Sequence, residues 1–220
     1  QDHLGYIWFT SDSKGLVRFD GKEYIYYKYN PENPKSIPSN IILSMQIDAK
    51  GIIWLASFDK GLISFDPSTN TFKNFRHSKT DSTSLLNDTT SCVFIDKDKA
   101  IWIGTYFGLD KLDPITGKFT HYRLDIKSNI KEQNTPLFQI TEDKTGNLWL
   151  AFGEPFGGKP EFLGGLYMFE KNTGKFTHYK ADPKNPTSLQ NPNVTAVFED
   201  SKGILWVGAK DNGLYQLDRK

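Results

Sequence analysis

Gly51-Ile-Ile-Trp54, continued by Gly61-Leu-Ile-Ser-Phe-Asp66, is the stretch of sequence that decides the fold. A similar phrase surrounds every tryptophan of the chain, namely Trp8, Trp54, Trp102, Trp149 and Trp206. Successive tryptophans are 46, 48, 47 and 57 residues apart, so the last interval is longer than the others. A period of this length is typical of proteins that stack supersecondary repeats. We therefore expect the five tryptophans to pack between neighbouring repeats.

Each repeat divides into four short strands, the first of which ends in an Asp-x-x-Gly turn such as Asp48-Ala-Lys-Gly51. Aspartate supports such a turn by accepting hydrogen bonds from backbone amides, and glycine adopts the left-handed backbone at little cost. The third repeat has Lys99 in place of that glycine. Lys99 must therefore adopt the left-handed backbone, at about 1 kcal/mol, or the turn must be of another type.

The second strand carries the tryptophan and is apolar on both faces, as expected for a strand between two neighbouring sheets. The third strand follows a Gly-Leu pair, and a tight hairpin then leads to a fourth strand such as Phe119-Thr-His-Tyr122. Short strands at regular spacing, with a period in the forties, predict an all-β fold. The expected architecture is a β-propeller of four-stranded antiparallel blades.

The whole chain, 1–220, is expected to form one β-propeller segment of about four and a half blades. Its first part has three strands in residues 1–30, and its last part has three strands in residues 193–220. Complete blades are expected at about 40–77, 88–125 and 136–181. Both partial blades keep their second and third strands, so together they do not make one blade. We therefore expect an arc of a larger ring, whose uncovered faces would favour self-association.

Composition excludes several classes of protein. The net charge is +1 and no run of lysine and arginine occurs, which argues against a nucleic-acid partner. No stretch approaches the roughly 18 apolar residues of a membrane span, and no signal peptide precedes the first repeat. Cys92 is the only cysteine, so neither an intrachain disulfide nor a cysteine-based metal site is expected. Asp96-Lys-Asp98 offers too few ligands for a calcium loop, and we expect no cofactor and no metal.

The pattern Asp-x-x-Gly-x-Ile/Leu-Trp-Ile/Val-Gly-Thr-x-x-Gly-Leu, followed by Phe/Leu-Asp-x-x-Thr-Gly-x-Phe-x-x-Tyr, resembles the two-component regulator propeller repeat. The clearest copy runs from Ile101 to Tyr122, and the resemblance covers essentially the whole chain. In that family the repeats build paired seven-bladed propellers in the extracytoplasmic sensors of hybrid histidine kinases, largely from Bacteroidetes-type bacteria. Those sensors detect oligosaccharides released from polysaccharides.

The resemblance implies a periplasmic segment of a sensor, with an oligosaccharide, the remaining blades of the same receptor and a second receptor copy as partners. The phrase Ile7-Trp-Phe-Thr10 is also similar to the repeat of streptogramin lyases, but in one repeat only.

The position of a ligand site can be predicted from the strand order alone. Because successive antiparallel strands alternate in direction, the second-to-third loops and the connections between repeats lie on one face. The distance from tryptophan to the following Gly-Leu pair is 6 or 7 residues in the first, second, third and fifth repeats. In the fourth repeat it is 16 residues. Connection 123–136 also differs from its counterparts. Variation on a rigid scaffold is typical of functional loops, so this face is where we expect a site.

The long loop between Gly153 and Gly165 and the pair Tyr106-Phe107 carry the candidate residues. An aromatic ring can stack on the apolar face of a sugar, and a carboxylate can accept hydrogen bonds from its hydroxyls. Alternatively, the loop is a tolerated insertion whose phenylalanines fold back on the blade, and the pair packs on a neighbouring blade. The predicted ligand-binding residues are Tyr106, Phe107, Glu154, Phe156, Glu161 and Phe162.

Three functions remain open: a glycan-binding sensor module, a propeller enzyme of the lyase or glycoside-active kind, and a structural or dimerisation segment. Glu154 and Glu161 could be a pair of glycosidase carboxylates, but one loop fixes the distance between them poorly. His121 and His178 occupy equivalent repeat positions, which indicates a structural role. The lack of convergent acid and base residues favours a binding module over an enzyme, and we expect no catalytic residues.

Overall fold

The structure, a computed structural model, describes residues 1–11, 13–106, 108–124, 136–153, 164–182, 184–217 and 219. These residues contain 18 strands, and no helix is found among them. The described part of the chain accordingly has no helix that could cross a membrane. The chain divides into two compact units, which are described separately: unit 1 is 1–105 with 110–121, and unit 2 is 106–109 with 122–220.

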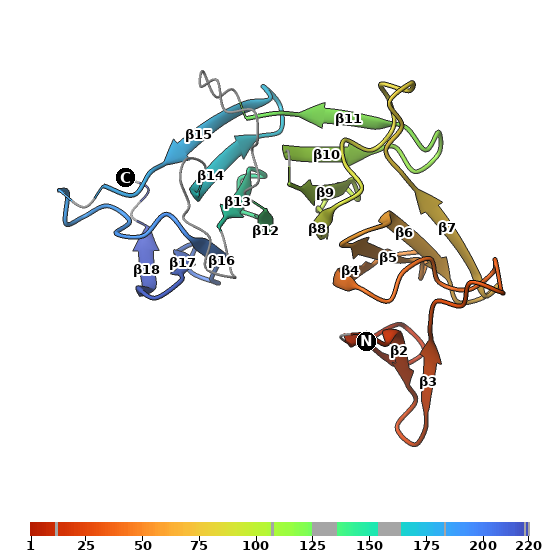
Figure 1. Cartoon of the computed structure of the whole chain (residues 1–220). Helices are drawn as coiled ribbons and strands as arrows, with labels where there is room; N and C mark the ends of the chain where they lie inside the picture. The colour runs from red at the N-terminus through yellow and green to blue at the C-terminus, as the bar shows by residue number, and fades with distance from the viewer. Residues whose placement is uncertain are drawn as a thin grey trace. The chain divides into compact units, whose positions relative to one another are not determined.

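Unit 1 contains two sheets and most of a third, and in each sheet the strands lie side by side in chain order (Figure 1). The first sheet consists of β1 (Ile7–Ser11), β2 (Gly15–Phe19) and β3 (Tyr24–Tyr27). The second consists of β4 (Ile42–Ile47), β5 (Ile53–Ser57), β6 (Gly61–Asp66) and β7 (Thr71–Phe75). The third consists of β8 (Thr90–Ile95), β9 (Ile101–Thr105), β10 (Gly108–Leu112) and β11 (Phe119–Tyr122).

Unit 2 contains two sheets with the same order. One consists of β12 (Leu137–Glu142), β13 (Leu148–Phe152), β14 (Gly165–Glu170) and β15 (Lys175–Tyr179). The other consists of β16 (Val194–Glu199), β17 (Leu205–Ala209) and β18 (Gly213–Leu217). The strand number and the sheets of three, four, four, four and three strands confirm the expected all-β, four-and-a-half-blade fold class. That residues 1–220 form one segment of a seven-bladed ring stays a prediction.

A hydrogen bond between tryptophan and aspartate recurs in every described sheet. The indole Nε1 donates to the Oδ2 of the aspartate six residues earlier, which is the aspartate of the Asp-x-x-Gly turn. The pairs are Trp8–Asp2 (2.7 Å), Trp54–Asp48 (3.0 Å), Trp102–Asp96 (2.8 Å), Trp149–Asp143 (2.8 Å) and Trp206–Asp200 (3.0 Å). The other carboxylate oxygen accepts backbone N–H groups of the turn, such as those of Lys50 and Ile52. One aspartate therefore holds both the turn and the strand that follows it.

The third repeat uses the same turn despite its missing glycine. Lys99 has φ of 67°, while the equivalent Gly51 and Gly146 have φ of 83° and 88°. The Lys99 N–H donates to Asp96 O at 2.9 Å, as the Gly51 N–H does to Asp48 O at 3.0 Å. Lys99 therefore adopts the left-handed backbone, which is the first of the two alternatives raised by the sequence.

The core of each unit is built between adjacent sheets. In unit 1, Trp8 and Leu16 of the first sheet cluster with Ile53 and Leu55 of the second. In unit 2, Trp149 clusters with Leu205 and Val207. Burying a large aromatic side chain removes roughly 200 Å² from water, worth up to roughly 5 kcal/mol. The tryptophans of these clusters thus join neighbouring sheets.

Candidate functional site

In the sheet of β12–β15, the loop and connection residues lie along one edge. Phe152 is paired with both Leu137 and Gly165, and Leu166 is paired with Tyr179. The start of β12, the end of β13, the start of β14 and the end of β15 therefore lie at the same end of the sheet. We call this end the connection edge of the sheet, and the end with the Asp-x-x-Gly turn its turn edge. The long loop leaves and re-enters unit 2 at the connection edge, as the strand order predicts.

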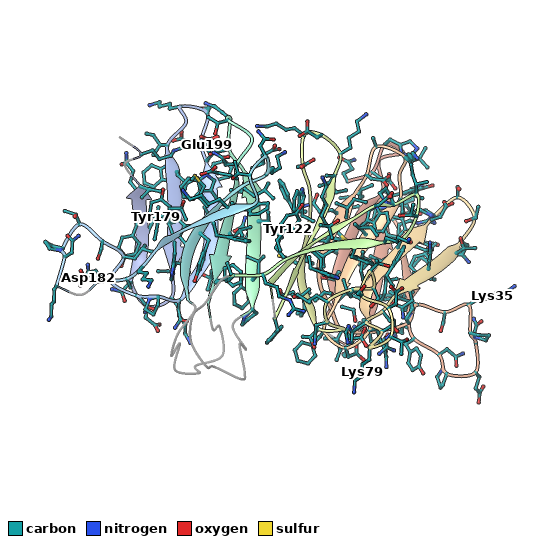
Figure 2. All side chains as sticks on the ribbon, turned by 90° about the horizontal axis from the view of Figure 1, so that it is seen from above. Lys35, Lys79, Tyr122, Tyr179, Asp182 and Glu199 are labelled. Atoms are coloured by element: carbon teal, nitrogen blue, oxygen red, sulfur yellow. The ribbon has the colours of Figure 1, made fainter. Side chains whose placement is uncertain are left out.

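The connections between repeats are held by their own polar side chains. In three of these connections, a serine hydroxyl accepts the backbone N–H six residues earlier. This bond joins Ser36 to Asn30, Ser84 to Ser78, and Ser188 to Asp182, at 3.0, 2.8 and 3.1 Å. Figure 2 labels Lys35 and Lys79, which belong to the two connections of unit 1. The serine side chain therefore holds the two ends of this seven-residue stretch of the connection together.

Of the six residues predicted to bind a ligand, only Tyr106 is described. Tyr106 directly follows β9 and is half-buried. Phe107, Glu154, Phe156, Glu161 and Phe162 lie outside the described residues. Their assignment to a ligand site stays a prediction, and the site is described from the residues on either side of the loop.

The two ends of the long loop, Gly153 and Gly164, lie tightly against the connection that precedes β16. A Cβ atom on Gly153 would lie 2.8 Å from Val194 O, and one on Gly164 would lie 2.3 Å from Pro192 O. Both distances are shorter than real Cβ contacts. These two positions therefore require glycine, and the loop is rooted directly against the neighbouring sheet's connection.

Three rings, which we call the aromatic row, lie beside the re-entry point of the loop: Phe152, Tyr167 and His178. Tyr167 and His178 are stacked, with centroids 3.9 Å apart and planes at 9°, and Phe152 meets Tyr167 edge-on at 5.1 Å. His178 Nε2 donates to Gly164 O at 3.2 Å. Burial lowers the pKa of His178 to about 4, so the imidazole is neutral at pH 7. Burial also raises the pKa of Tyr167, which keeps its hydroxyl protonated.

The equivalent positions in unit 1 hold a different pair. His121 Nδ1 lies 2.7 Å from Oδ1 of the fully buried Asp110, and His121 Nε2 lies 2.9 Å from Ser82 O. Asp110 also accepts the Leu86 N–H at 2.7 Å. In both units the histidine thus holds a loop or connection through a backbone carbonyl, in agreement with the structural role inferred from its repetition. The exchange of Asp110 for Tyr167 replaces a carboxylate beside the histidine with a phenol ring that stacks on it.

Sequence reasoning did not identify the aromatic row. The signal was present, because Tyr167 and His178 both follow the long loop, at positions held by Asp110 and His121 one repeat earlier. The sequence signal identifies the aromatic row only when the register of β14 on β15 is known, because in that register Tyr167 lies opposite His178.

Comparison with known proteins supports the repeat assignment. Residues 84–107 and 188–211 match the family described as two component regulator propeller. The chain is 24% identical to the extracellular domain of the putative hybrid two component system BT3049 from B. thetaiotaomicron, with a TM-score of 0.81. That alignment covers 100% of this chain and 28% of the other, so the chain spans little more than a quarter of that domain.

Two further solved structures have the same fold. Virginiamycin B lyase from Staphylococcus aureus gives a TM-score of 0.63 at 17% identity, covering 98% of this chain and 67% of the lyase. The WD40 β-propeller domain of Doa1 gives 0.66 at 15% identity, covering 100% of this chain and 62% of the other. No curated protein sequence matches the chain. The chain therefore has the fold of a β-propeller, and two of its segments, residues 84–107 and 188–211, match the two component regulator propeller family.

Proposed function

We propose that this chain is part of the periplasmic ligand-binding region of a two-component receptor, which binds an oligosaccharide and relays binding to a histidine kinase. The observation that carries the proposal is the contrast between the two edges of the sheets. The turn edge repeats the same Asp–Trp bond five times among the described residues. The connection edge of unit 2 instead carries a long loop rooted on Gly153 and Gly164.

The chemistry of this edge suits a neutral, ring-shaped ligand. The aromatic row is uncharged at pH 7, because burial keeps His178 deprotonated and Tyr167 protonated. In our proposal Phe156 and Phe162 stack on sugar rings, while Glu154 and Glu161 accept hydroxyl hydrogen bonds. Tyr106 and Phe107 would form a second aromatic surface in the preceding repeat.

The contacts of the loop ends supply a route for the relay. Gly164 lies against Pro192, and Gly153 lies against Val194, which begins β16. A ligand that moves the loop would press on this connection, because the close packing leaves no space to absorb the movement. The receptor class is supported by the family match, and the extracytoplasmic location by the description of the BT3049 structure as an extracellular domain.

The test is a Phe156→Ala, Phe162→Ala double variant of the full receptor. An oligosaccharide panel, read by calorimetry on the whole ectodomain, first identifies a ligand. We expect at least a tenfold loss of affinity for it, since two stacking rings are removed. Phe58→Ala is the matched control, because Phe58 is 44% exposed on a second-to-third loop of ordinary length in unit 1. An unchanged affinity in the double variant would remove the long loop from the site.

A second candidate function is a lyase, which is favoured only by the fold likeness to virginiamycin B lyase. Three histidines of the described chain each have a ring nitrogen within hydrogen-bond distance of a backbone carbonyl: His77 with Leu85, His121 with Ser82 and His178 with Gly164. This use of their rings supports structural roles. Turnover of a polysaccharide or a streptogramin by the purified ectodomain, followed by mass spectrometry, would decide for the lyase.

The structural alternative predicts a third outcome. A segment that serves only the receptor homodimer would leave every oligosaccharide of the panel unbound by the ectodomain. The same variants would then change the dimer dissociation constant, measured by analytical ultracentrifugation.

A further inference from the structure

In unit 1, the connection between β7 and β8 is attached to the sheet that follows it, the sheet of β8–β11. One attachment is a backbone bond, in which Thr83 O accepts the N–H of Phe119 at 2.7 Å. Phe119 begins β11, and its side chain fills a slot in the core of unit 1, where it is 6% exposed. This attachment involves no ionisable group.

Two further contacts run through a pair of ionisable side chains, Asp110 of β10 and His121 of β11 (Figure 1). Asp110 is fully buried, and its Oδ2 accepts the Leu86 N–H at 2.7 Å. Its Oδ1 lies 2.7 Å from His121 Nδ1. The other ring nitrogen, His121 Nε2, lies 2.9 Å from Ser82 O. Leu86 and Ser82 both belong to the connection, so the pair joins the connection to both strands.

The two ring nitrogens of His121 therefore face two oxygens that accept hydrogen bonds. A backbone carbonyl and an ionised carboxylate have no proton to donate. A neutral imidazole carries one N–H, so it donates to Ser82 O or to Asp110 but not to both, whereas the doubly protonated ring donates to both. Both contacts are satisfied together only while the pair holds one proton more than a carboxylate and a neutral imidazole hold.

Loss of that proton affects the two contacts unequally. A buried carboxylate that loses a donor is costly, so the remaining ring proton stays on Nδ1, facing Asp110. His121 Nε2 then presents a lone pair to Ser82 O, and two acceptors at this distance repel each other. The contact with Ser82 is therefore the one that opens. The proton leaves to solvent, because the His121 side chain is 22% exposed.

We propose that the pair Asp110–His121 is a proton-dependent latch, which holds the connection between β7 and β8 closed on the sheet of β8–β11 while the extra proton is bound. The closed state binds more protons than the open state, so it is favoured as pH falls and weakens as pH rises. The latch is independent of the function proposed above, because neither residue is among the predicted ligand residues and both belong to unit 1.

The same two positions lack a carboxylate beside a histidine in the sheets on either side along the chain. The sheet of β4–β7 has Ile63 opposite Asn74, neither of which titrates. The sheet of β12–β15 has His178 opposite Tyr167. Burial lowers the pKa of His178 to about 4, so that ring holds Gly164 O in its neutral form, with one N–H. The aspartate is thus what makes the contact in the sheet of β8–β11 sensitive to a proton.

Other charged or titratable groups lie on the elements packed against His121. In the described part of unit 1 these are Lys111 on β10, Lys118 before β11, and Arg76, His77, Lys79 (labelled in Figure 2), Asp81 and Asp88 on the connection. Lys111 follows Asp110 directly and so points to the opposite face of the sheet, where its Nζ lies over the Trp102 ring. Within the described chain, the His121 ring is hydrogen-bonded to Asp110 and Ser82 alone. Asp110 is therefore the charge that governs the proton.

Nitrogen-15 spectra of the whole chain, labelled in its four histidines, read the ring protons directly from about pH 5 to about pH 9. We expect protons on both nitrogens of His121 at the acidic end and on Nδ1 alone at the alkaline end. His178 should carry a proton on Nε2 alone at every pH. A single ring proton on His121 at the acidic end would overturn the proposal. So would an Nε2 proton alone at the alkaline end, because it would keep the Ser82 contact without the extra proton.

Hydrogen exchange measures the opening of the connection itself. The Ser84 N–H donates to Asp81 O within the connection, and its protection, corrected for the intrinsic exchange rate, should fall by up to about tenfold per pH unit once the proton is lost. The Ser36 N–H is the matched control, because it donates to Asn33 O at the equivalent place in the connection before β4. Its protection should not depend on pH, and equal pH dependence of the two amides would contradict the latch.

Asp110→Asn tests the carboxylate with an isosteric side chain. The asparagine oxygen accepts the Leu86 N–H, and its NH₂ donates to a bare His121 Nδ1, so the neutral ring donates to Ser82 O through Nε2. We expect the variant to stay closed, with Ser84 protection constant within about twofold over the same pH range. If the variant keeps the pH dependence of the unmodified chain, the proposal is wrong. The ring spectra of the unmodified chain test the proposal whether or not the variant folds.

Discussion

Asp48→Ala is the substitution that most directly tests how the repeat is held together. Asp48 accepts hydrogen bonds from Trp54 Nε1 at 3.0 Å and from the backbone of Lys50 and Ile52 at 2.8 and 3.0 Å. Trp54 is only 5% exposed, so its N–H would lose its acceptor in a buried place. An unsatisfied buried donor costs about 1–3 kcal/mol, and each lost backbone bond about 0.5–1.5 kcal/mol. The expected loss of unfolding free energy is therefore about 3 kcal/mol.

Urea unfolding, followed by tryptophan fluorescence and circular dichroism, measures this loss. With a slope of roughly 2 kcal/mol per molar urea, the midpoint should fall by roughly 1.5 M. Asp20→Ala is the matched control, because Asp20 also accepts two turn N–H groups, from Lys22 and Glu23, but is exposed and has no indole partner. A double-mutant cycle with Trp54→Phe should give a coupling of about 1–2 kcal/mol. If Asp48→Ala costs no more than Asp20→Ala, the indole bond is not what stabilises the repeat.

Lys99→Gly removes a left-handed lysine (φ 67°) and should stabilise the chain by about 0.5–1 kcal/mol, seen as a higher melting temperature; a lower one would contradict the turn geometry. Asp143 is partly desolvated, which raises its pKa, but the donors Thr145 and Trp149 outweigh burial and lower it below 3.8. Its carboxylate therefore contributes stability that is complete above about pH 4 and is lost as pH falls through the lowered folded pKa. Asp143→Asn should flatten the decline of melting temperature below pH 4. An unchanged decline would exclude this carboxylate as a cause of the acid sensitivity. Phe119→Ala should cost about 3–5 kcal/mol in urea unfolding, because it empties the slot that Phe119 fills, and a loss under about 1 kcal/mol would contradict that packing.

Most of the fold follows from repetition. Five copies of one tryptophan phrase predict the strands, their order and the sheets of three or four strands that the structure contains. The Asp–Trp bond was also present in the sequence as a constant spacing of six residues, from Asp2–Trp8 to Asp200–Trp206. The sequence predicts those aspartates only as turn residues, because turn chemistry alone explains an Asp-x-x-Gly pattern. The second carboxylate oxygen and its indole donor become apparent only when the two strands are folded together.

The site is less predictable than the fold. Strand direction alone placed the long loop at the connection edge, and the pairing of Leu137, Phe152 and Gly165 agrees with this. Gly153 and Gly164 could not be identified as close contacts, because their neighbours Val194 and Pro192 come from the next repeat. The predicted ligand residues depend on the loop itself and stay predictions. The connections and turns repeat, whereas a contact that occurs once leaves no periodic signal.

Not every departure from the repeat points to function, and the turn edge of unit 2 shows why. Glu142 and Glu199 stand where the second and third blades have Ile47 and Ile95, and Lys171 and Arg219 stand where those blades have prolines.

Each glutamate binds the basic residue of its own sheet: Lys171 Nζ donates to Glu142 at 2.8 Å, and Arg219 donates to Glu199. The Glu142 and Glu199 side chains are only 4% and 7% exposed, so an unpaired charge there would be costly. The two changes therefore occur together and satisfy each other, which is the mark of a structural substitution. The long loop lies outside the described residues, so no such pairing can be assigned to it, and the role of its aromatic and acidic residues in ligand binding stays a prediction.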